Sequence, residues 1–214
     1  MKIIDHTLDF ETMGTDPDSI VLSCAITFHR RGKVDYTFQE LVEKTHYFKF
    51  DIEHQQKEFG RTYSERTLEW WQKQDPEVRK AQFTPSEYDF TLGEFITAYY
   101  NLLEQYGSNN LSMAFCRGQS FDFPILKNIH QSVRNSNPDF FPTPFWQQSD
   151  IRSILRGLMM DLTVRNIPMP DGTLKGFKKH NPIHDNAKAI MEMQWAYRYA
   201  DGEELPEYID PESL

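Results

Sequence analysis

Asp9 and Glu11 stand two residues apart near the end of the apolar run Ile3-Ile4-Asp5-His6-Thr7-Leu8-Asp9-Phe10-Glu11-Thr12. In a strand, residues i and i+2 point to the same face, so both carboxylates would lie together. Two like charges this close are costly unless a cation lies between them. A hard divalent metal ion with oxygen ligands would meet that need. The alternative is a solvated acidic pair on an exposed strand.

Two further motifs supply matching groups. Asp122 follows the strand-like run 111–116 and a turn at Gly118, where open α/β sheets build their sites. Near the other end of the chain, Asn181 is a good helix N-cap and is followed by proline. His180 and Asp185 would then occupy the two positions that touch across such a cap. The alternatives are helix-dipole compensation for both acids and a surface loop for the histidine.

Together these motifs contain four acids and one histidine. Two divalent ions about 4 Å apart, bridged by carboxylates, can stabilise the attacking and leaving oxygens of a phosphodiester. A histidine outside the metal cluster can take the proton of the attacking water. The inventory therefore indicates two-metal phosphodiester hydrolysis.

The ordered motifs Asp9-Phe10-Glu11, Phe121-Asp122 and His180 through Asp185 resemble those of the DEDD (DnaQ-like) superfamily of 3′–5′ exonucleases. The histidine indicates the histidine subclass, and the wider sequence is most similar to the phage exonuclease A (DexA) type. The resemblance implies a ribonuclease H-like α/β fold, with a mixed sheet flanked by helices in a single domain. It implies two Mg²⁺ ions, with Mn²⁺ as a substitute, and a single-stranded nucleic acid with a free 3′ end. DNA is expected before RNA.

The resemblance also implies roles for the site residues. Asp9, Glu11 and Asp185 would bind the tighter ion, Asp9 and Asp122 would reach the second, and His180 would be the base. Candidate substrate contacts are Thr12, Met13, Gly14, Phe123 and Arg117. Met13 could wedge against the terminal base and Phe123 could stack on a base, the alternatives being a simple turn and a core position. Many family members carry Asn where Arg117 stands, and we expect Arg117 to hold a phosphate.

The charge of −9 is unevenly distributed. Six of the 32 acids lie between Asp201 and Leu214, which leaves 26 acids against 23 bases. We therefore predict an exonuclease domain over 1–200 and an acidic tail over 201–214. This balance excludes a broad clamp that binds DNA mainly by phosphate neutralisation, but not a polyanionic substrate.

Other bulk features bound the setting of the protein. No apolar run approaches the roughly 20 residues of a membrane span, so no membrane partner is expected. Cys24 and Cys116 lie in apolar runs and are predicted to be reduced core residues, which suits a cytoplasmic protein. The resemblance to the phage type implies the host cytoplasm during phage infection as one such location. A homodimer is compatible with the sequence, which does not define the oligomeric state.

Hydrophobic periodicity predicts strands first and helices later. The expected strands are 2–10, 20–28, 34–39, 44–50 and 111–116, and the expected helices are 64–74, 75–83, 91–106, 122–134, 150–161 and 182–200. One domain with a mixed, helix-flanked sheet accounts for this order.

Three rival functions remain open from the residues. The doublet His184-Asp185 is typical of all-helical HD phosphohydrolases, and His180 with His184 imitates half a zinc motif. A non-catalytic nucleic-acid-binding module on the same fold is the third, and it would be expected to lose at least one acid.

Overall fold

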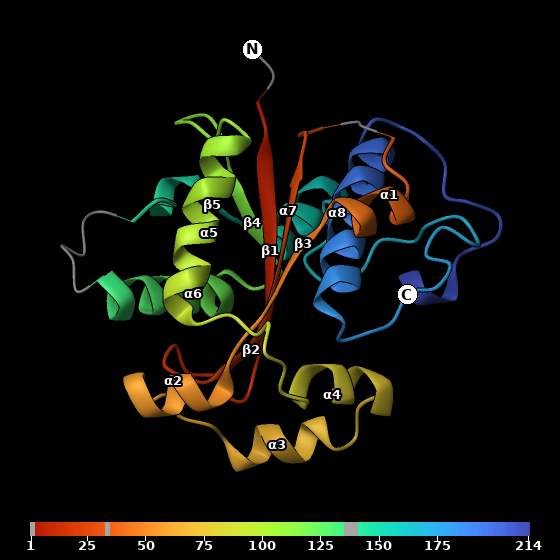
Figure 1. Cartoon of the computed structure of the whole chain (residues 1–214). Helices are drawn as coiled ribbons and strands as arrows, with labels where there is room; N and C mark the ends of the chain where they lie inside the picture. The colour runs from red at the N-terminus through yellow and green to blue at the C-terminus, as the bar shows by residue number, and fades with distance from the viewer. Residues whose placement is uncertain (1–2, 33–34, 135–140) are drawn as a thin grey trace.

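The computed structural model describes residues 3–32, 35–134 and 141–214. Its centre is a five-stranded mixed sheet of order β3-β2-β1-β4-β5 (Figure 1). Strand β1 (Asp5–Thr12) pairs antiparallel with β2 (Val21–His29), which pairs antiparallel with β3 (His46–Lys49). On its other side β1 pairs parallel with β4 (Ala114–Cys116), and β4 pairs parallel with β5 (Gln148–Asp150). The predicted α/β class is confirmed.

Helices cover both faces of the sheet (Figure 1). Helices α5 (Leu92–Gln105) and α6 (Gln119–Arg134) bury one face. Helix α8 (Pro182–Ala200) lies on the other, packed with α1 (Phe38–Lys44) and α7 (Ile151–Met159). Three short helices, α2 (Ile52–Phe59), α3 (Glu65–Trp71) and α4 (Pro76–Phe83), lie together beyond one end of the sheet.

Side chains along β1 alternate between the two faces of the sheet, and this determines which of them face each helix layer. Leu8 and Phe10 are buried in the core formed with α5 and α6. Thr7 pairs with Phe115 of β4, and Phe115 packs in the core on the α8 side. Asp9 and Glu11 share the face of Thr7, because residues two apart in a strand point the same way. They therefore face α8.

The main error of the sequence prediction lies between β2 and β3. A strand was expected over 34–39, but helix α1 begins at Phe38 behind a capping box in which Thr37 and Glu40 bond each other's backbone N–H. Phe38 and Leu41 are buried against the α8 layer, and that burial favours the helix. Val34 lies outside the described residues. The sequence reading also missed α2 and β5.

The acidic segment near the end of the chain packs on the loop 167–174. The amide N of Asp171 donates to Tyr208 O at 2.9 Å, and that of Asp210 donates to Met169 O at 2.8 Å. Asp210 is buried, and so is Ser213 in the short 3₁₀ helix η2 (Pro211–Ser213). The predicted tail thus contains a docked segment, residues 208–214.

Two smaller expectations concern the thiols and the membrane. Cys24 and Cys116 are both buried and form no disulfide, as predicted. Within the described parts of the chain, no helix combines the length and hydrophobicity needed to cross a membrane.

Candidate active site

Asp9 and Glu11 project from β1 into a cavity of about 450 Å³ between the sheet and α8. Both side chains are partly buried. Their neighbours on β2, Ala25 opposite Asp9 and Ser23 opposite Glu11, are small and uncharged. These β2 neighbours therefore supply no positive charge to compensate the acids. The two carboxylates point into the cavity.

Asp122 enters the same cavity from the first turn of α6 because the β1–β4 ladder is short. The paired register is His6 with Ala114 and Thr7 with Phe115. Farther along β1, the amide N of Phe10 donates to Asp122 Oδ1 at 3.0 Å. The Asp122 carboxylate thus accepts the hydrogen bond that a strand partner would otherwise accept. Because Phe10 follows Asp9, this bond holds Asp122 beside Asp9.

His180 and Asp185 are positioned by the start of α8. Asn181 caps the helix by accepting from the amide N of Ile183, and Pro182 follows it. The amide N of His180 donates to Asp185 Oδ2 at 2.7 Å, so the predicted contact across the cap forms. His180 has φ of 62°, a left-handed conformation that is uncommon outside glycine. The surrounding structure must hold this conformation, which aims the histidine at the cavity.

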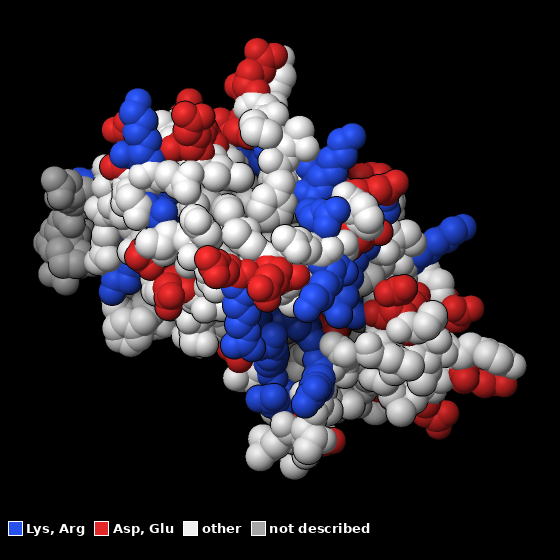
Figure 2. Space-filling view, turned by 90° about the horizontal axis from the view of Figure 1, so that it is seen from below, with Lys and Arg blue, Asp and Glu red and all other residues white. Residues whose placement is uncertain are grey.

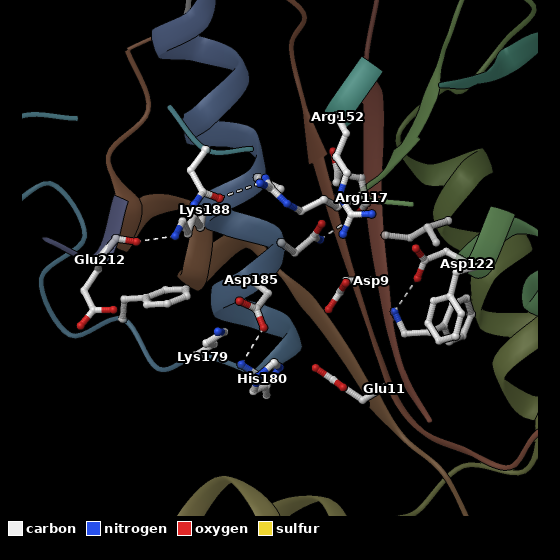
Figure 3. A pocket seen from close by; sticks show the side chains of 18 of the residues that line it. Asp9, Glu11, Arg117, Asp122, Arg152, Lys179, His180, Asp185, Lys188 and Glu212 are labelled. Atoms are coloured by element: carbon white, nitrogen blue, oxygen red, sulfur yellow. Dashed lines mark hydrogen bonds between the residues drawn. The ribbon is translucent and has the colours of Figure 1, made fainter. Parts of the chain in front are cut away.

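The structure brings all five predicted chemical groups to one place. Ligand atoms of Glu11, His180 and Asp185 lie within 4.8 Å of one another. Asp9 and Asp122 line the same cavity. In Figure 3, Asp122 and Asp185 lie on opposite sides of Asp9, and His180 lies beyond Asp185 toward Glu11. Segments more than 100 residues apart in the sequence therefore share one site.

The position of His180 is also set by aromatic side chains. Its ring meets that of Trp70, from α3, edge-on at a centroid distance of 4.7 Å. Trp71 lies on the same side at 6.4 Å, and its indole Nε1 donates to Thr12 O at 2.8 Å. Helix α3 is thus tied to the end of β1 and supports the histidine ring.

Burial raises the pKa of every acid of the site. Burial raises the pKa of Asp122 to about 7 and that of Asp185 to about 6. The pKa values of Asp9 and Glu11 also rise well above their usual range, first by burial and then through neighbouring carboxylates. Burial lowers the pKa of His180, which favours a neutral ring at pH 7. Four partly or fully buried carboxylates that line one cavity are a donor set that fits hard divalent cations.

These shifts predict how stability depends on pH. With EDTA present, we expect the midpoint of thermal unfolding to fall as the pH rises from about 6.5 to about 8. Below this range the buried His6 and His29, whose pKa values burial lowers to about 3 and about 4, act in the opposite direction. The folded-state pKa values of Asp122 and Asp185, about 7 and 6, lie above that of unfolded Asp. The unfolded chain therefore loses its protons first, and rising pH favours it. Mg²⁺ should stabilise more at pH 8 than at pH 5, because it binds ionised carboxylates.

Differential scanning fluorimetry at constant ionic strength measures both trends. Asp16→Asn, at an exposed position outside the cavity, is the control for a simple change of net charge. A midpoint that rises with pH over that upper range in EDTA, or an equal Mg²⁺ effect at pH 8 and pH 5, would contradict the prediction.

Arg117 lines the cavity, but its guanidinium is bound to the protein itself. It forms an ion pair with Glu192, a fully buried acid of α8, and its Nη2 donates to Asn166 Oδ1 at 2.9 Å. A buried carboxylate without a paired cation is strongly destabilising, so the ion pair with Glu192 is favoured over a guanidinium that points to solvent. Arg117 thus joins the β4–α6 turn to α8 while it lines the cavity, and its contact with a phosphate stays a prediction.

The structure corrects two of the predicted base contacts. Met13 is buried with Ile20 and Trp71 in a small core beneath α3 and α4. Phe123 is only 2% exposed, within the core on the α5 and α6 face. Burying these apolar side chains stabilises the fold more than exposing them would. Neither side chain is therefore available to contact a nucleotide base.

Thr12 and Gly14 do line a second cavity, of about 490 Å³, which adjoins the first at Phe10, Glu11 and Phe121. A Cβ at Gly14 would clash with Ser19 Oγ, so packing alone requires a glycine there. The predicted close approach to substrate remains a prediction for these two residues.

Sequence reasoning assigned no substrate role to several residues that line the cavities around the acids, namely Phe121, Arg66, Arg152 and Lys188. Phe121 and Trp70 line the second cavity, and Trp70 is 39% exposed. The helical period could have separated Phe121 from Phe123, because positions two apart lie on nearly opposite sides of a helix. The cationic residues that line the two cavities are Arg66, Arg117, Arg152, Lys179 and Lys188. Figure 2 shows Lys and Arg side chains gathered around a hollow on the face seen from below.

The structure argues against two of the rival functions. A mixed sheet is at the centre of the fold, whereas an HD phosphohydrolase would be all-helical. His184 Nδ1 accepts from the amide N of Lys178 at 2.9 Å, and its ring packs edge-on against Phe38. It is therefore held away from His180, and the half zinc motif does not form.

Two comparisons with known proteins cover most of the chain. The family model of the 3′–5′ exoribonuclease Rv2179c-like domain matches residues 5–196. An exodeoxyribonuclease of enterobacteria phage T4 is 37% identical over 226 residues, covering 99% of this chain and 98% of that protein.

Solved structures of E. coli exonuclease I share the fold. The zinc-bound complex with single-stranded DNA has a TM-score of 0.61 at 12% identity and covers 94% of this chain. A complex with an oligonucleotide has a TM-score of 0.55 at 13% identity and covers 92%. The chain spans only 42% and 43% of those two exonuclease I chains.

The family match and the phage relative each extend over most of the chain, and they confirm the resemblance drawn from the motifs. The chain belongs to the 3′–5′ exoribonuclease Rv2179c-like domain family and is an exonuclease.

Proposed function

We propose that this chain is a Mg²⁺-dependent 3′–5′ exonuclease that releases 5′-mononucleotides from single-stranded DNA. The observation that supports the proposal is the convergence of four acids and a histidine in one cavity. In this proposal a single domain, residues 1–200, carries the four acids and the histidine. The enzyme is expected in the cytoplasm, and a homodimer stays a prediction.

The four acids would bind two different metal ions. Asp9, Glu11 and Asp185 would hold one divalent ion, and Asp9 with Asp122 would hold the second. Two such ions, when bound, neutralise charge on the attacking and leaving oxygens. Mn²⁺ should replace Mg²⁺, since both accept carboxylate oxygens in octahedral geometry.

His180 would accept the proton of the attacking water at a ring nitrogen. Burial lowers its pKa, so the ring is available as a neutral base at pH 7. Trp70 limits rotation of the ring by its edge-on contact, and the bond from His180 N to Asp185 fixes the backbone. The base would thereby be preorganised before substrate arrives.

The second cavity suits the terminal nucleotide. Phe121 and Trp70 offer aromatic faces next to Glu11, and Arg66 lies beside them. A base can enter such a cavity only when it is unpaired and unstacked, which favours a single strand. The phage relative is named an exodeoxyribonuclease and covers nearly the whole chain, so DNA is the first candidate. The family description names an exoribonuclease, so RNA is the second.

A labelled-substrate assay tests the proposal. We expect 5′-labelled single-stranded DNA to shorten from its 3′ end in Mg²⁺, and 3′-labelled DNA to release labelled mononucleotide first. RNA of the same sequence and a blunt duplex, assayed in parallel, rank the substrates. A covalently closed single-stranded circle is the matched control, because it has no 3′ end. Cleavage of the circle, or activity that persists in EDTA, would contradict the proposed function.

A further inference from the structure

Lys188 lies one helical turn after Asp185 on α8, and both side chains line the main cavity. Its ammonium Nζ donates to the main-chain O of Glu212 and lies 5.1 Å from the ring centroid of Phe177. Both are uncharged partners. Arg117, by contrast, is neutralised by the buried Glu192. Burial lowers the pKa of Lys188, and the carboxylates of Asp185 and Glu212 partly offset that shift. The ammonium therefore lies in the cavity beside the metal-binding Asp185, which favours its charged form, and is not neutralised by a buried acid as Arg117 is.

The Glu212 carbonyl is held in place by the docking of residues 208–214. Asp210 Oδ2 accepts from the amide N of Leu174 at 2.8 Å, and Ser213 Oγ accepts from that of Met169 at 3.1 Å. Both Asp210 and Ser213 are buried, the latter completely. Pro211 and Glu212 then line the cavity on the side of Lys188, as Figure 3 shows for Glu212. The docked segment thus forms a wall of the active site.

From these contacts we infer that Lys188 binds a phosphate group next to the scissile one, and that residues 208–214 hold its ammonium toward the cavity for this purpose. The inference rests on the proposed exonuclease function. A single hydrogen bond to a carbonyl leaves two N–H donors of the ammonium for phosphate oxygens. The phosphate could belong to the neighbouring nucleotide of the strand or to the released 5′-mononucleotide, and the two sources are separable by experiment.

Lys188→Met tests the inference, since it keeps most of the aliphatic stem and removes the charge. We expect KM for a single-stranded oligonucleotide to rise about tenfold, with kcat changed less than about twofold. The slope of log binding constant against log salt should fall by about 0.7, which corresponds to one phosphate contact on a single strand. Lys127→Met is the matched control, because Lys127 is exposed on α6 and lines neither cavity. Lys188→Arg should retain the wild-type slope.

Product inhibition distinguishes the two sources of phosphate. If Lys188 contacts the mononucleotide, the inhibition constant of a 5′-mononucleotide should rise about tenfold in Lys188→Met. If it contacts the neighbouring nucleotide, that constant should stay unchanged while KM rises. No change in KM, inhibition constant or salt slope relative to Lys127→Met would overturn the inference.

A double-mutant cycle tests the role of the segment. Asp210→Ala should raise KM as Lys188→Met does, and the double variant should be no worse than either single one. Additive effects would show that the segment does not act through Lys188. If Asp210→Ala unfolds, Ser213→Ala replaces it in the cycle. Anisotropy of a labelled oligonucleotide in Ca²⁺ gives the same comparison without turnover, so an inactive wild-type protein would count against the proposed function and not against Lys188.

Discussion

Asp9→Asn is expected to lower the single-turnover rate by at least about 10³-fold, equivalent to about 4 kcal/mol of transition-state stabilisation. Asp9 lies between Asp122 and Asp185 and is the acid proposed to contact both ions (Figure 3). Asn keeps the shape of the side chain but removes the charge that a bridging ligand must carry. The loss should appear as weaker binding of Mn²⁺, measured by calorimetry or electron paramagnetic resonance.

The same substitution should have the opposite effect on stability without metal. Burial and three neighbouring carboxylates raise the pKa of Asp9, so ionising it in the folded state is costly. Asp9→Asn should therefore raise the thermal midpoint in EDTA and lose most of the Mg²⁺-dependent increase. Asp16→Asn, which makes the same change at an exposed position outside the cavity, should behave as wild type. Wild-type turnover in Asp9→Asn would overturn the metal assignment.

His180→Ala is expected to lower turnover by about 10²- to 10⁴-fold, the usual contribution of a general base, while metal affinity is retained. The loss should be greatest near neutral pH and smaller at high pH, where hydroxide replaces the base. Because burial lowers the pKa of His180, the acidic limb of the wild-type pH profile should lie below the ordinary histidine value. This limb should disappear in the variant when Mn²⁺ is saturating.

Two further variants make the result specific. His180→Asn suits the left-handed backbone at this position, with its φ of 62°, and separates loss of the base from backbone strain. His184→Ala, one turn away, should keep turnover within about threefold, because its ring contacts Phe38 instead of the acids. A collapse of metal affinity in His180→Asn would make His180 a ligand and restore the zinc alternative.

Local sequence was sufficient for the parts of the site that depend on local geometry. Strand alternation places Asp9 and Glu11 on one face, and the structure shows both lining one cavity. The N-cap at Asn181 brings His180 and Asp185 into contact, because cap geometry is set within five residues. The order of the three motifs was enough to identify the family.

Other features depend on contacts between distant segments, and no local pattern encodes them. Asp122 bonds the amide N of Phe10 only because the β1–β4 ladder ends early. Phe121 lines the cavities and Phe123 enters the core because α6 packs with one particular face on the sheet. Arg117 is committed to Glu192, 75 positions farther along the chain, because a buried acid needs a cation.

The sequence by itself thus identified the family and predicted the chemistry of its site from four acids and one histidine in a fixed order. The tertiary structure decided which of the surrounding side chains can reach a substrate. The physical reason is that burial is a property of the packed molecule. The same burial that removes Met13 and Phe123 from the site also places residues 208–214 beside Lys188 as a wall of the active site.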